Sequence, residues 1–365
     1  MRKFTLIFLV TSLLSLPASI PAQTRPATIT DQEFWRLVTD MSEEGGRFAQ
    51  QFMSNEDSYQ AVVPALKTSA PKNGVYIGVG SEQNFTYIVA AQPSLSFIVD
   101  IRRDNMLEHL MYKAIFQMSQ DRADFISRLF SRKRPAAFNT AASAPELFAS
   151  FETMDADSGA SDQTLQLVRD NLVNAHKFPL TDADIASIGR ILNAIRIAGP
   201  SSLKGTGDLT TTYAQLMSLT DPAGNNQSYL ASEENFRSIQ RLENENRVIP
   251  LVGDFAGSKA LAALGKYLKA QNETVNVFYV SNVERYLFDD FAHGRQFYSN
   301  VAGLPLNGSS VFIRSVTTDI SKRLGFPLPD GKEKWRTFLV PINDCLQRLN
   351  NGGIKGYPDL FAGVK

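Results

Sequence analysis

The chain has 365 residues, of which 43% are hydrophobic and 20% are charged, a composition typical of a globular protein with one large or two ordinary domains. Lysine plus arginine and aspartate plus glutamate number 37 each, so the formal net charge is zero, which argues against a general nucleic-acid binder. Cys345 is the only cysteine, which excludes an internal disulfide, and the three scattered histidines predict no metal site.

Residues 1–22 have the three-part layout of a secretory signal peptide. Arg2 and Lys3 are positive, a short apolar run follows, and the segment ends in small residues near Ala22. The apolar run is too short to span a bilayer, so we expect cleavage and export to the periplasm or the extracellular space. A buried N-terminal helix is the alternative. No later stretch is long and apolar enough to predict a transmembrane helix, so we expect a secreted, soluble mature chain.

Residues 23–73 predict an N-terminal helical segment and a connector. The stretch TITDQEFWRLVTDMSEE has apolar residues at helical spacing from Phe34 to Met41. Thr30 and Glu33 before them fit a capping box, in which a hydroxyl and a carboxylate satisfy free N–H groups at a helix start. A polar, proline-containing connector then leads to the next element.

Residues 74–104 predict two buried strands separated by a polar turn and the start of a helix. Apolar residues occupy successive positions in 75–79 and again in 95–101. Strands that are buried on both faces have this continuous pattern, which is typical of a parallel sheet covered by helices on its two sides.

Residues 105–246 contain little strand signal and predict a large helical insertion. Apolar residues keep one helical face in 104–117, and further helical patterns follow. Thr181 and Asp184 form a second candidate capping box. We expect a short helix that ends before Pro135, a surface loop at 136–160, and helices at 163–175, 182–197 and 232–245.

Residues 247–365 return to alternating strands and helices. Strands are predicted at 248–252, 275–280 and 310–316, and the segments WRTFLVPI and NDCLQRLNNGG add a last strand and a last helix within a C-terminal extension. This alternation predicts an α/β fold, with a doubly wound, mainly parallel sheet into which the helical block is inserted.

The first predicted strand ends in glycines at the spacing that nucleotide-type cofactors need. Gly78 and Gly80 would let backbone N–H groups approach a ligand, and Asp100 stands twenty residues after Gly80, where an acid binds ribose hydroxyls. The third glycine of the dinucleotide pattern is absent, because Gln83 occupies its place. The alternative is a plain strand, turn and strand whose glycines serve the turn.

Four segments together resemble the class I S-adenosylmethionine-dependent methyltransferases, and they occur in that family's order. VYIGVGSEQN resembles the glycine loop, FIVDIRR the strand with the ribose-binding acid, VIPLVGDF the segment beside the adenine, and NVFYVSNVERYL the segment that faces methyl donor and acceptor. The resemblance, more particularly to an exported bacterial branch, implies a Rossmann-like sheet but no reaction. It implies S-adenosylmethionine as the cofactor, with Gly78, Gly80, Asp100, Asp254, Ser281, Asn282 and Glu284 near it.

Several polar residues beside this pattern have two interpretations. Glu82 begins the helix after the glycine loop, where its side chain could cap the helix or contact the ligand. Arg102 is a candidate phosphate ligand or a solvent-facing side chain. His109 is a candidate general base or a structural histidine.

The hypothesis that we favour from the sequence is an exported, non-catalytic protein that binds a small-molecule ligand or a protein partner. An S-adenosylmethionine-dependent methyltransferase is the alternative, since methyl transfer needs orientation more than a strong nucleophile. An NAD(P)-dependent oxidoreductase is a second alternative, disfavoured by Gln83. A hydrolase has no support, because neither a G-x-S-x-G nor an H-E-x-x-H motif occurs.

Overall fold

One six-stranded sheet organises the computed structural model, which describes residues 28–49, 51–205, 211–325 and 334–362. The predicted signal peptide lies outside these described residues. The strand order is β3-β2-β1-β4-β5-β6; neighbouring strands run parallel except β5 and β6, which are antiparallel. The strands are β1 (Val75–Gly78), β2 (Leu95–Asp100), β3 (Val248–Val252), β4 (Val275–Ser281), β5 (Val311–Thr317) and β6 (Trp335–Pro341).

The sheet confirms the strands predicted from the apolar runs. The five strands expected to share one mainly parallel sheet do so, and the last predicted strand joins its edge as β6. Ile77 in β1 pairs with Phe97 in β2 and with Phe278 in β4, and all three side chains are fully buried. Continuous burial along these strands explains why their apolar residues do not alternate with polar ones.

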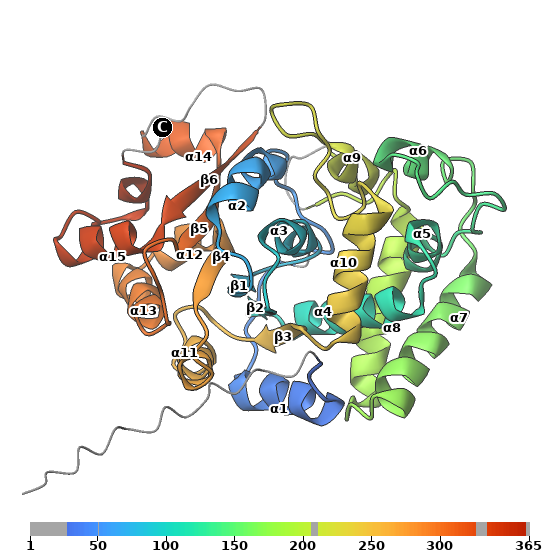
Figure 1. The fold of residues 1–365 in the computed structure, drawn as a ribbon, viewed down its shortest axis with the longest axis horizontal. Coiled ribbons are helices and arrows are strands. Elements are labelled where there is room, and N and C mark those ends of the chain that lie inside the picture. Colours follow the sequence, from blue (N-terminus) through green and yellow to red (C-terminus); the bar gives the residue numbers. More distant parts are fainter. Residues whose placement is uncertain (1–27, 50, 206–210, 326–333, 363–365) are drawn as a thin grey trace, which may run out of the picture.

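Helices cover both sides of the sheet, as Figure 1 shows. On one side lie α11 (Ala260–Ala270), α13 (Phe291–Ala302) and α15 (Ile342–Asn350), and on the other lie α3 (Gln83–Ala91), α4 (Arg103–Met118) and α10 (Glu233–Asn244). Helix α1 (Asp31–Met41) packs against the edge strand β3. Shorter elements complete the fold: a 3-10 helix at Tyr59–Val62, α2 (Val63–Ser69), α12 (Val283–Leu287), α14 (Thr318–Leu324) and a 3-10 helix at Tyr357–Phe361.

The predicted helical insertion packs on one side of the sheet through α4 (Figure 1). Between β2 and β3 the described residues contain helices and two isolated bridges but no strand. An aromatic cluster joins this block to α3: the centroid of the Phe116 ring lies 5.2 Å from that of Phe85 and 4.5 Å from that of Phe125. The block contains α5 (Arg122–Phe130), α6 (Ala144–Ala149), α7 (Ser158–Arg169) with a π-helical continuation (Asp170–Ala175), α8 (Asp182–Ala198) and α9 (Tyr213–Ser218).

Local capping signals predicted some helix starts well. The Thr181 and Asp184 capping box is confirmed at the start of α8, and the Thr30 hydroxyl accepts a hydrogen bond from the backbone N–H of Glu33. The surface loop predicted at 136–160 was wrong in part, because α6 forms there behind a capping box of Ser143 and Glu146. In the part of the chain that the structure describes, no helix is long and apolar enough to cross a membrane.

Candidate functional site

The segment between α1 and the first 3-10 helix crosses the carboxyl ends of the parallel strands. We call residues 42–49 and 51–57 the strap. Its first part is fixed to the end of β3, where the backbone N–H of Glu43 donates to the carbonyl of Val252 at 3.0 Å. The N–H of Gly46 then donates to the carbonyl of Ile101 after β2 at 2.8 Å.

The second part of the strap continues across the sheet to its other edge. The carbonyl of Gln51 accepts from the Ser81 hydroxyl at 3.2 Å, in the loop after β1. The carboxylate of Asp57 accepts from the backbone N–H of Lys334 at 3.0 Å and of Trp335 at 2.9 Å, where β6 begins. The strap therefore extends from β3 to β6 over the edge where open α/β sheets bind ligands.

A cavity of about 660 Å³ lies between the strap and this edge of the sheet. Ligand pockets commonly have volumes of about 300–1,000 Å³, with apolar walls and a few convergent polar groups. The cavity includes the point between β1 and β4 where the strand order reverses. Its lining residues include Phe48, Gln51, Ser54, Glu56, Gly80, Gln83, Asp100, Arg102, Asp254, Phe255, Tyr279, Ser281, Asn282, Arg285, Tyr286, Asp319, Lys334 and Trp335.

Most of the residues that the sequence analysis singled out for a cofactor converge on this cavity. They come from the loops after four different strands, and those that line it are Gly80, Asp100, Asp254, Ser281 and Asn282. Gly78 and Glu82 are not among the lining residues.

Gly78 and Gly80, at and after the end of β1, are glycines for different structural reasons. Gly80 has a φ of 77°, a left-handed conformation that favours glycine, and a Cβ there would meet open space. At Gly78 a Cβ would collide with the side chain of Asn84. That side chain holds the loop, because its amide donates to the carbonyls of Val79 at 2.9 Å and Ser81 at 2.7 Å. Gly78 therefore serves close packing beneath the loop.

The capping role predicted for Glu82 was wrong. Glu82 stands at the N-cap of α3, but its side chain makes no capping bond. Both carboxylate oxygens instead accept the backbone N–H of Ser54 in the strap, at 3.1 Å each. The side chain is fully buried, and this desolvation raises the pKa of Glu82 to about 7.

Two further titratable groups are buried beside the glycine loop. Burial, followed by the charge of Glu82, raises the pKa of Glu108, and one Glu108 oxygen has no hydrogen-bond partner in the described structure. The Nε2–H of His109 donates to the carbonyl of Gly80 at 2.8 Å, and burial lowers the pKa of His109 to about 4. His109 is thus a neutral structural histidine that supports the loop.

Asp100 is held by its neighbour Arg102. One oxygen accepts the backbone N–H of Arg102 at 2.8 Å and its Nε–H at 3.0 Å, and the other accepts Nη2–H at 2.9 Å. Arg102 also donates to the carbonyl of Gln51 in the strap at 3.3 Å. The solvent-facing role of Arg102 was wrong, because its side chain is mostly buried and ties Asp100 to the strap. Its role as a phosphate ligand stays a prediction.

The most unusual group of the site is Glu56 in the strap, which the sequence analysis missed. Its side chain is 1% exposed and lies in the cavity wall. The donors to its carboxylate are neutral: Gln83 Nε2 at 2.8 Å, Tyr279 OH at 3.0 Å, Ser281 Oγ at 2.5 Å and Ser315 Oγ at 2.6 Å. Burial raises the pKa of Glu56, and the four hydrogen bonds oppose that shift.

Ser281 joins Glu56 to the end of β4 in a strained conformation. Its φ is 52°, a backbone conformation that residues other than glycine and asparagine rarely adopt. The pairing of β4 with β5 also shifts register between Tyr279 and Ser281. Backbone strain of this kind is concentrated at functional sites. The Ser281 hydroxyl donates to Glu56, and both residues line the cavity.

Asp254 and Glu284 occupy different surroundings. The loop of Asp254 is held by the strap, because its backbone N–H donates to the Glu43 carboxylate at 2.8 Å. Glu284 was expected to face the reacting groups, but it does not line the cavity. It is fully buried in an ion pair with Arg314 and accepts the Tyr298 hydroxyl at 2.5 Å.

The mouth of the cavity carries exposed aromatic rings. Phe48 of the strap and Tyr286 of α12 pack edge to face, with centroids 5.0 Å apart, although they are 48% and 40% exposed. The guanidinium of Arg285 lies 5.2 Å from the Tyr286 ring. These rings give the entrance an apolar rim.

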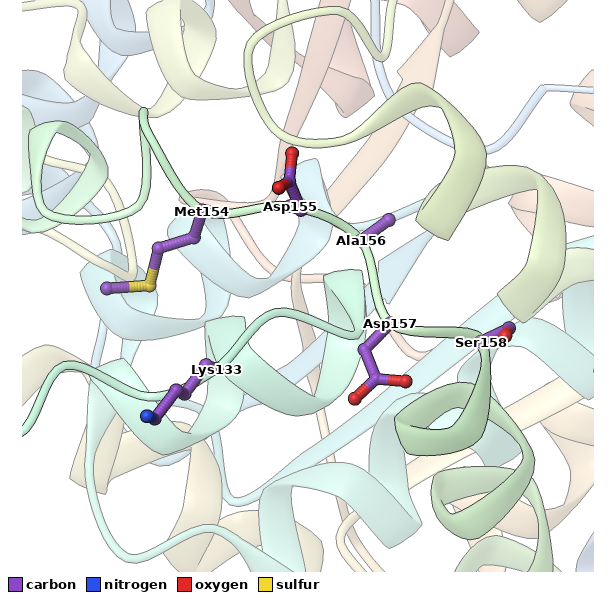
Figure 2. Close-up of a pocket in the computed structure, with 6 residues that line it drawn as sticks. All are labelled: Lys133, Met154, Asp155, Ala156, Asp157 and Ser158. Atoms are coloured by element: carbon purple, nitrogen blue, oxygen red, sulfur yellow. The ribbon is translucent and has the colours of Figure 1, made fainter.

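A second hollow, of about 450 Å³, lies in the helical block (Figure 2). It is formed where the chain at Lys133 passes the segment 154–158, beside the bridge between Arg132 and Ala156. Figure 2 shows that Asp155 and Asp157 point in different directions from this segment. Most of its residues are exposed, and none of the predicted cofactor residues is among them. Among the described residues, no group of three or more His, Cys, Asp or Glu side chains could hold a metal ion.

Comparison with protein families matches residues 51–357 to the family described as "Domain of unknown function (DUF7790)". This match covers most of the chain. The chain belongs to that family. The matched segment, residues 51–357, begins within the strap and includes all six strands of the sheet. The cavity is therefore built almost entirely from the family's domain. No curated protein matches the chain.

Proposed function

We propose that this protein is an exported binding protein with a doubly wound, Rossmann-like sheet, whose cavity holds a nucleoside-type small molecule. The strand order is that of the common doubly wound fold, and the two sides of the sheet carry helices. The antiparallel β6 is the departure from that arrangement. The layout of residues 1–22 supports export.

One observation carries the proposal. Gly80, Asp100 and Asp254 lie far apart in the sequence, yet they line the same cavity as Ser281 and Asn282. The resemblance to S-adenosylmethionine-dependent methyltransferases implies these positions for the loop, the ribose, the adenine and the reacting end of a cofactor. Their convergence where the strand order reverses is the arrangement that a nucleoside ligand needs.

The contacts inside the cavity favour binding over catalysis. Asp100 is paired with Arg102, and Glu56 accepts four hydrogen bonds from the protein itself. A base that is committed in this way is poorly placed to take a proton from a substrate. A methyltransferase is the second candidate, because Asn282 after β4 lines the same cavity as the glycine loop and methyl transfer needs orientation more than a strong nucleophile.

A thermal-shift screen of residues 23–365 tests the proposal. S-adenosylmethionine, S-adenosylhomocysteine, adenosine, NAD and NADP are added separately, and a ligand at about one hundred times its Kd stabilises the folded state by about 2.7 kcal/mol. We expect a higher unfolding midpoint with at least one adenosyl compound. The absence of any shift across the panel contradicts the proposal.

A pair of variants shows where a ligand binds. Ala49→Trp places a large side chain in the cavity wall and should abolish the shift, whereas Ala141→Trp, on an exposed loop of the helical block, should leave it unchanged. Conversion of S-adenosylmethionine to S-adenosylhomocysteine by the purified protein with candidate acceptors would favour the methyltransferase over the binding protein.

A further inference from the structure

The second part of the strap is attached to the protein at three points through carboxyl groups. At the first point, the backbone N–H of Ser54 donates to both oxygens of Glu82. At the second, the carboxyl group of Glu56 binds the side-chain amide of Gln83 at the start of α3. At the third, the carboxylate of Asp57 accepts two backbone N–H groups where β6 begins. Carboxyl groups titrate, so the attachment of this part of the strap depends on their protonation.

Glu82 is fully buried at the first of these points. The hydrogen bonds to its carboxyl group come from backbone N–H groups, those of Ser54 and of Glu82 itself. In the described part of the chain, no cation is among the groups that act on Glu82, and a charge on Glu56 opposes its ionisation. Glu108 adds another buried carboxyl group, one oxygen of which has no hydrogen-bond partner in the described structure. These surroundings favour the neutral form of Glu82.

The titratable groups around Glu82 supply no counter-charge near pH 7. Those within electrostatic reach of it come from each element packed against it: Glu56 on the strap, Tyr59 on the 3-10 helix, Glu108 and Tyr112 on α4, Tyr213 on α9 and Tyr229 before α10. Burial raises the pKa of all four tyrosines and of both glutamates. His109 is a neutral ring, and Arg102 is paired with Asp100. Glu82, whose pKa burial raises to about 7, therefore titrates near neutral pH without a cation to hold its charged form.

The strap is the part of these surroundings that moves at the lowest cost. Ser54 contacts the Glu82 carboxyl group directly and lies outside the helices and strands, whereas α3 and α4 pack against the sheet. Local opening of such a segment costs less free energy than the unfolding of a buried helix or strand. An ionised carboxyl group gains hydration when Ser54 moves away, and a neutral one gains much less. Ionisation of Glu82 therefore favours displacement of the strap.

We propose that residues 53–56 form a pH-sensitive latch on the cavity, which is closed while Glu82 is protonated and opens as Glu82 ionises. Ser54 and Glu56 of this segment line the cavity, so opening of the latch moves part of the cavity wall. The latch is a property of the strap and needs no ligand. Its consequence, that a bound molecule exchanges with solvent faster at pH 8 than at pH 5, rests on the proposed function.

Amide hydrogen exchange, measured by mass spectrometry on residues 23–365 at pH 5 and pH 8, tests the latch. The rate for an unstructured peptide of the same sequence, divided by the measured rate, gives a protection factor without the intrinsic effect of pH. We expect the protection factor of residues 53–56 to fall about tenfold or more from pH 5 to pH 8, since each unit by which the pKa of Glu82 is raised changes the opening equilibrium up to about tenfold. At both pH values it should lie about tenfold or more below that of β2, because the latch opens without global unfolding.

Isosteric variants assign the effect to Glu82. Glu82→Gln keeps the shape and does not titrate, so the protection of residues 53–56 should change less than about threefold between the two pH values. Glu234→Gln makes the same change on the exposed face of α10 and should follow the unmodified protein. A full pH effect in Glu82→Gln overturns the assignment to Glu82.

The unmodified protein decides the latch itself, even where Glu82→Gln fails to fold. Equal protection of residues 53–56 at pH 5 and pH 8 overturns the latch, as does protection equal to that of β2 at both pH values, which would indicate global unfolding alone. These measurements contain no ligand, so the absence of a thermal shift with the nucleosides contradicts the proposed function and leaves the latch standing.

Discussion

Two glutamates are buried beside β4 and β5, and their carboxylates are stabilised by different kinds of partner. Glu284 is paired with Arg314 of β5 and lies outside the cavity. Glu56 accepts hydrogen bonds from neutral groups and forms part of the cavity wall.

The difference separates a structural group from a functional one. A buried charge with a well-oriented counter-charge keeps its ionised form and fixes the packing around it. A buried carboxyl without a counter-charge pays a desolvation penalty that the fold alone does not require. Such groups with perturbed pKa values are concentrated at binding and catalytic sites. The comparison therefore favours the cavity beside Glu56 as the candidate site.

The largest expected effect comes from breaking the compensated pair. Arg314→Met leaves Glu284 buried beside the Tyr298 hydroxyl without a counter-charge, so we expect the free energy of unfolding to fall by about 3–5 kcal/mol in urea denaturation. Arg36→Met removes an exposed ion pair with Glu33 and should change the free energy by less than about 1 kcal/mol. A loss below about 1 kcal/mol in Arg314→Met would show that Glu284 needs no counter-charge.

The second effect tests a buried carboxyl that lacks a counter-charge through the pH dependence of stability. Glu82 has a pKa of about 7 in the folded protein against 4.5 when unperturbed, so its protonated form stabilises the fold below pH 4.5. That stabilisation is lost as the pH rises through 7. Glu82→Gln does not titrate, so its stability relative to the unmodified protein should rise by about 2–3 kcal/mol from pH 5 to pH 8.

The control for this measurement is Glu234→Gln, which changes an exposed glutamate and should follow the unmodified protein at every pH. Urea denaturation at pH 5, 6, 7 and 8 gives the required free energies. A Glu82→Gln profile parallel to that of the unmodified protein would contradict the buried, uncompensated state of Glu82.

The third effect concerns Asp100, which has an arginine counter-charge as Glu284 has, but lines the cavity as Glu56 does. Asp100→Asn keeps the shape but leaves Arg102 mostly buried without a counter-charge, so we expect a loss of about 1–2 kcal/mol in the free energy of unfolding. If a ribose shares this carboxylate, affinity for the nucleoside ligand should also fall about tenfold. A stability loss with unchanged affinity would limit Asp100 to holding the strap.

The smallest effect separates strain from hydrogen bonding at Ser281. Ser281→Ala loses the hydrogen bond to Glu56 and keeps the positive φ, so it should destabilise the fold by about 1 kcal/mol. Ser281→Gly loses the same bond but adopts that φ without strain, so it should be about 1 kcal/mol more stable than Ser281→Ala. Thermal unfolding of both variants measures the difference. A less stable glycine variant would show that the conformation carries no strain.

The regular elements could be predicted from the sequence because their signals are local. The apolar runs of β1 and β2 predicted strands buried on both faces, and the hydroxyl and carboxylate at Thr181 and Asp184 predicted the start of α8. The helix α6 was missed because it is only six residues long, and its surroundings are rich in alanine and serine.

The candidate site could be predicted in part. The loops after parallel strands meet at one edge of a sheet, so the strand pattern sufficed to bring Gly80, Asp100 and Asp254 together. The role of Gly78 was missed because it depends on the side chain of Asn84 beneath the loop, and no pattern of spacing encodes that contact.

The sequence by itself determined the strands, most of the helices, and which strand ends carry glycine or acidic residues, since those features depend on neighbours within a few positions. The tertiary structure decided which charges are compensated. Ser315 donates to Glu56 across 259 positions of sequence, and the N–H of Ser54 binds Glu82 across 28. Glu56 and Glu82 acquire their burial and these hydrogen-bond donors because the strap crosses the sheet. Glutamate therefore forms a buried ion pair at position 284 and lines the cavity at position 56.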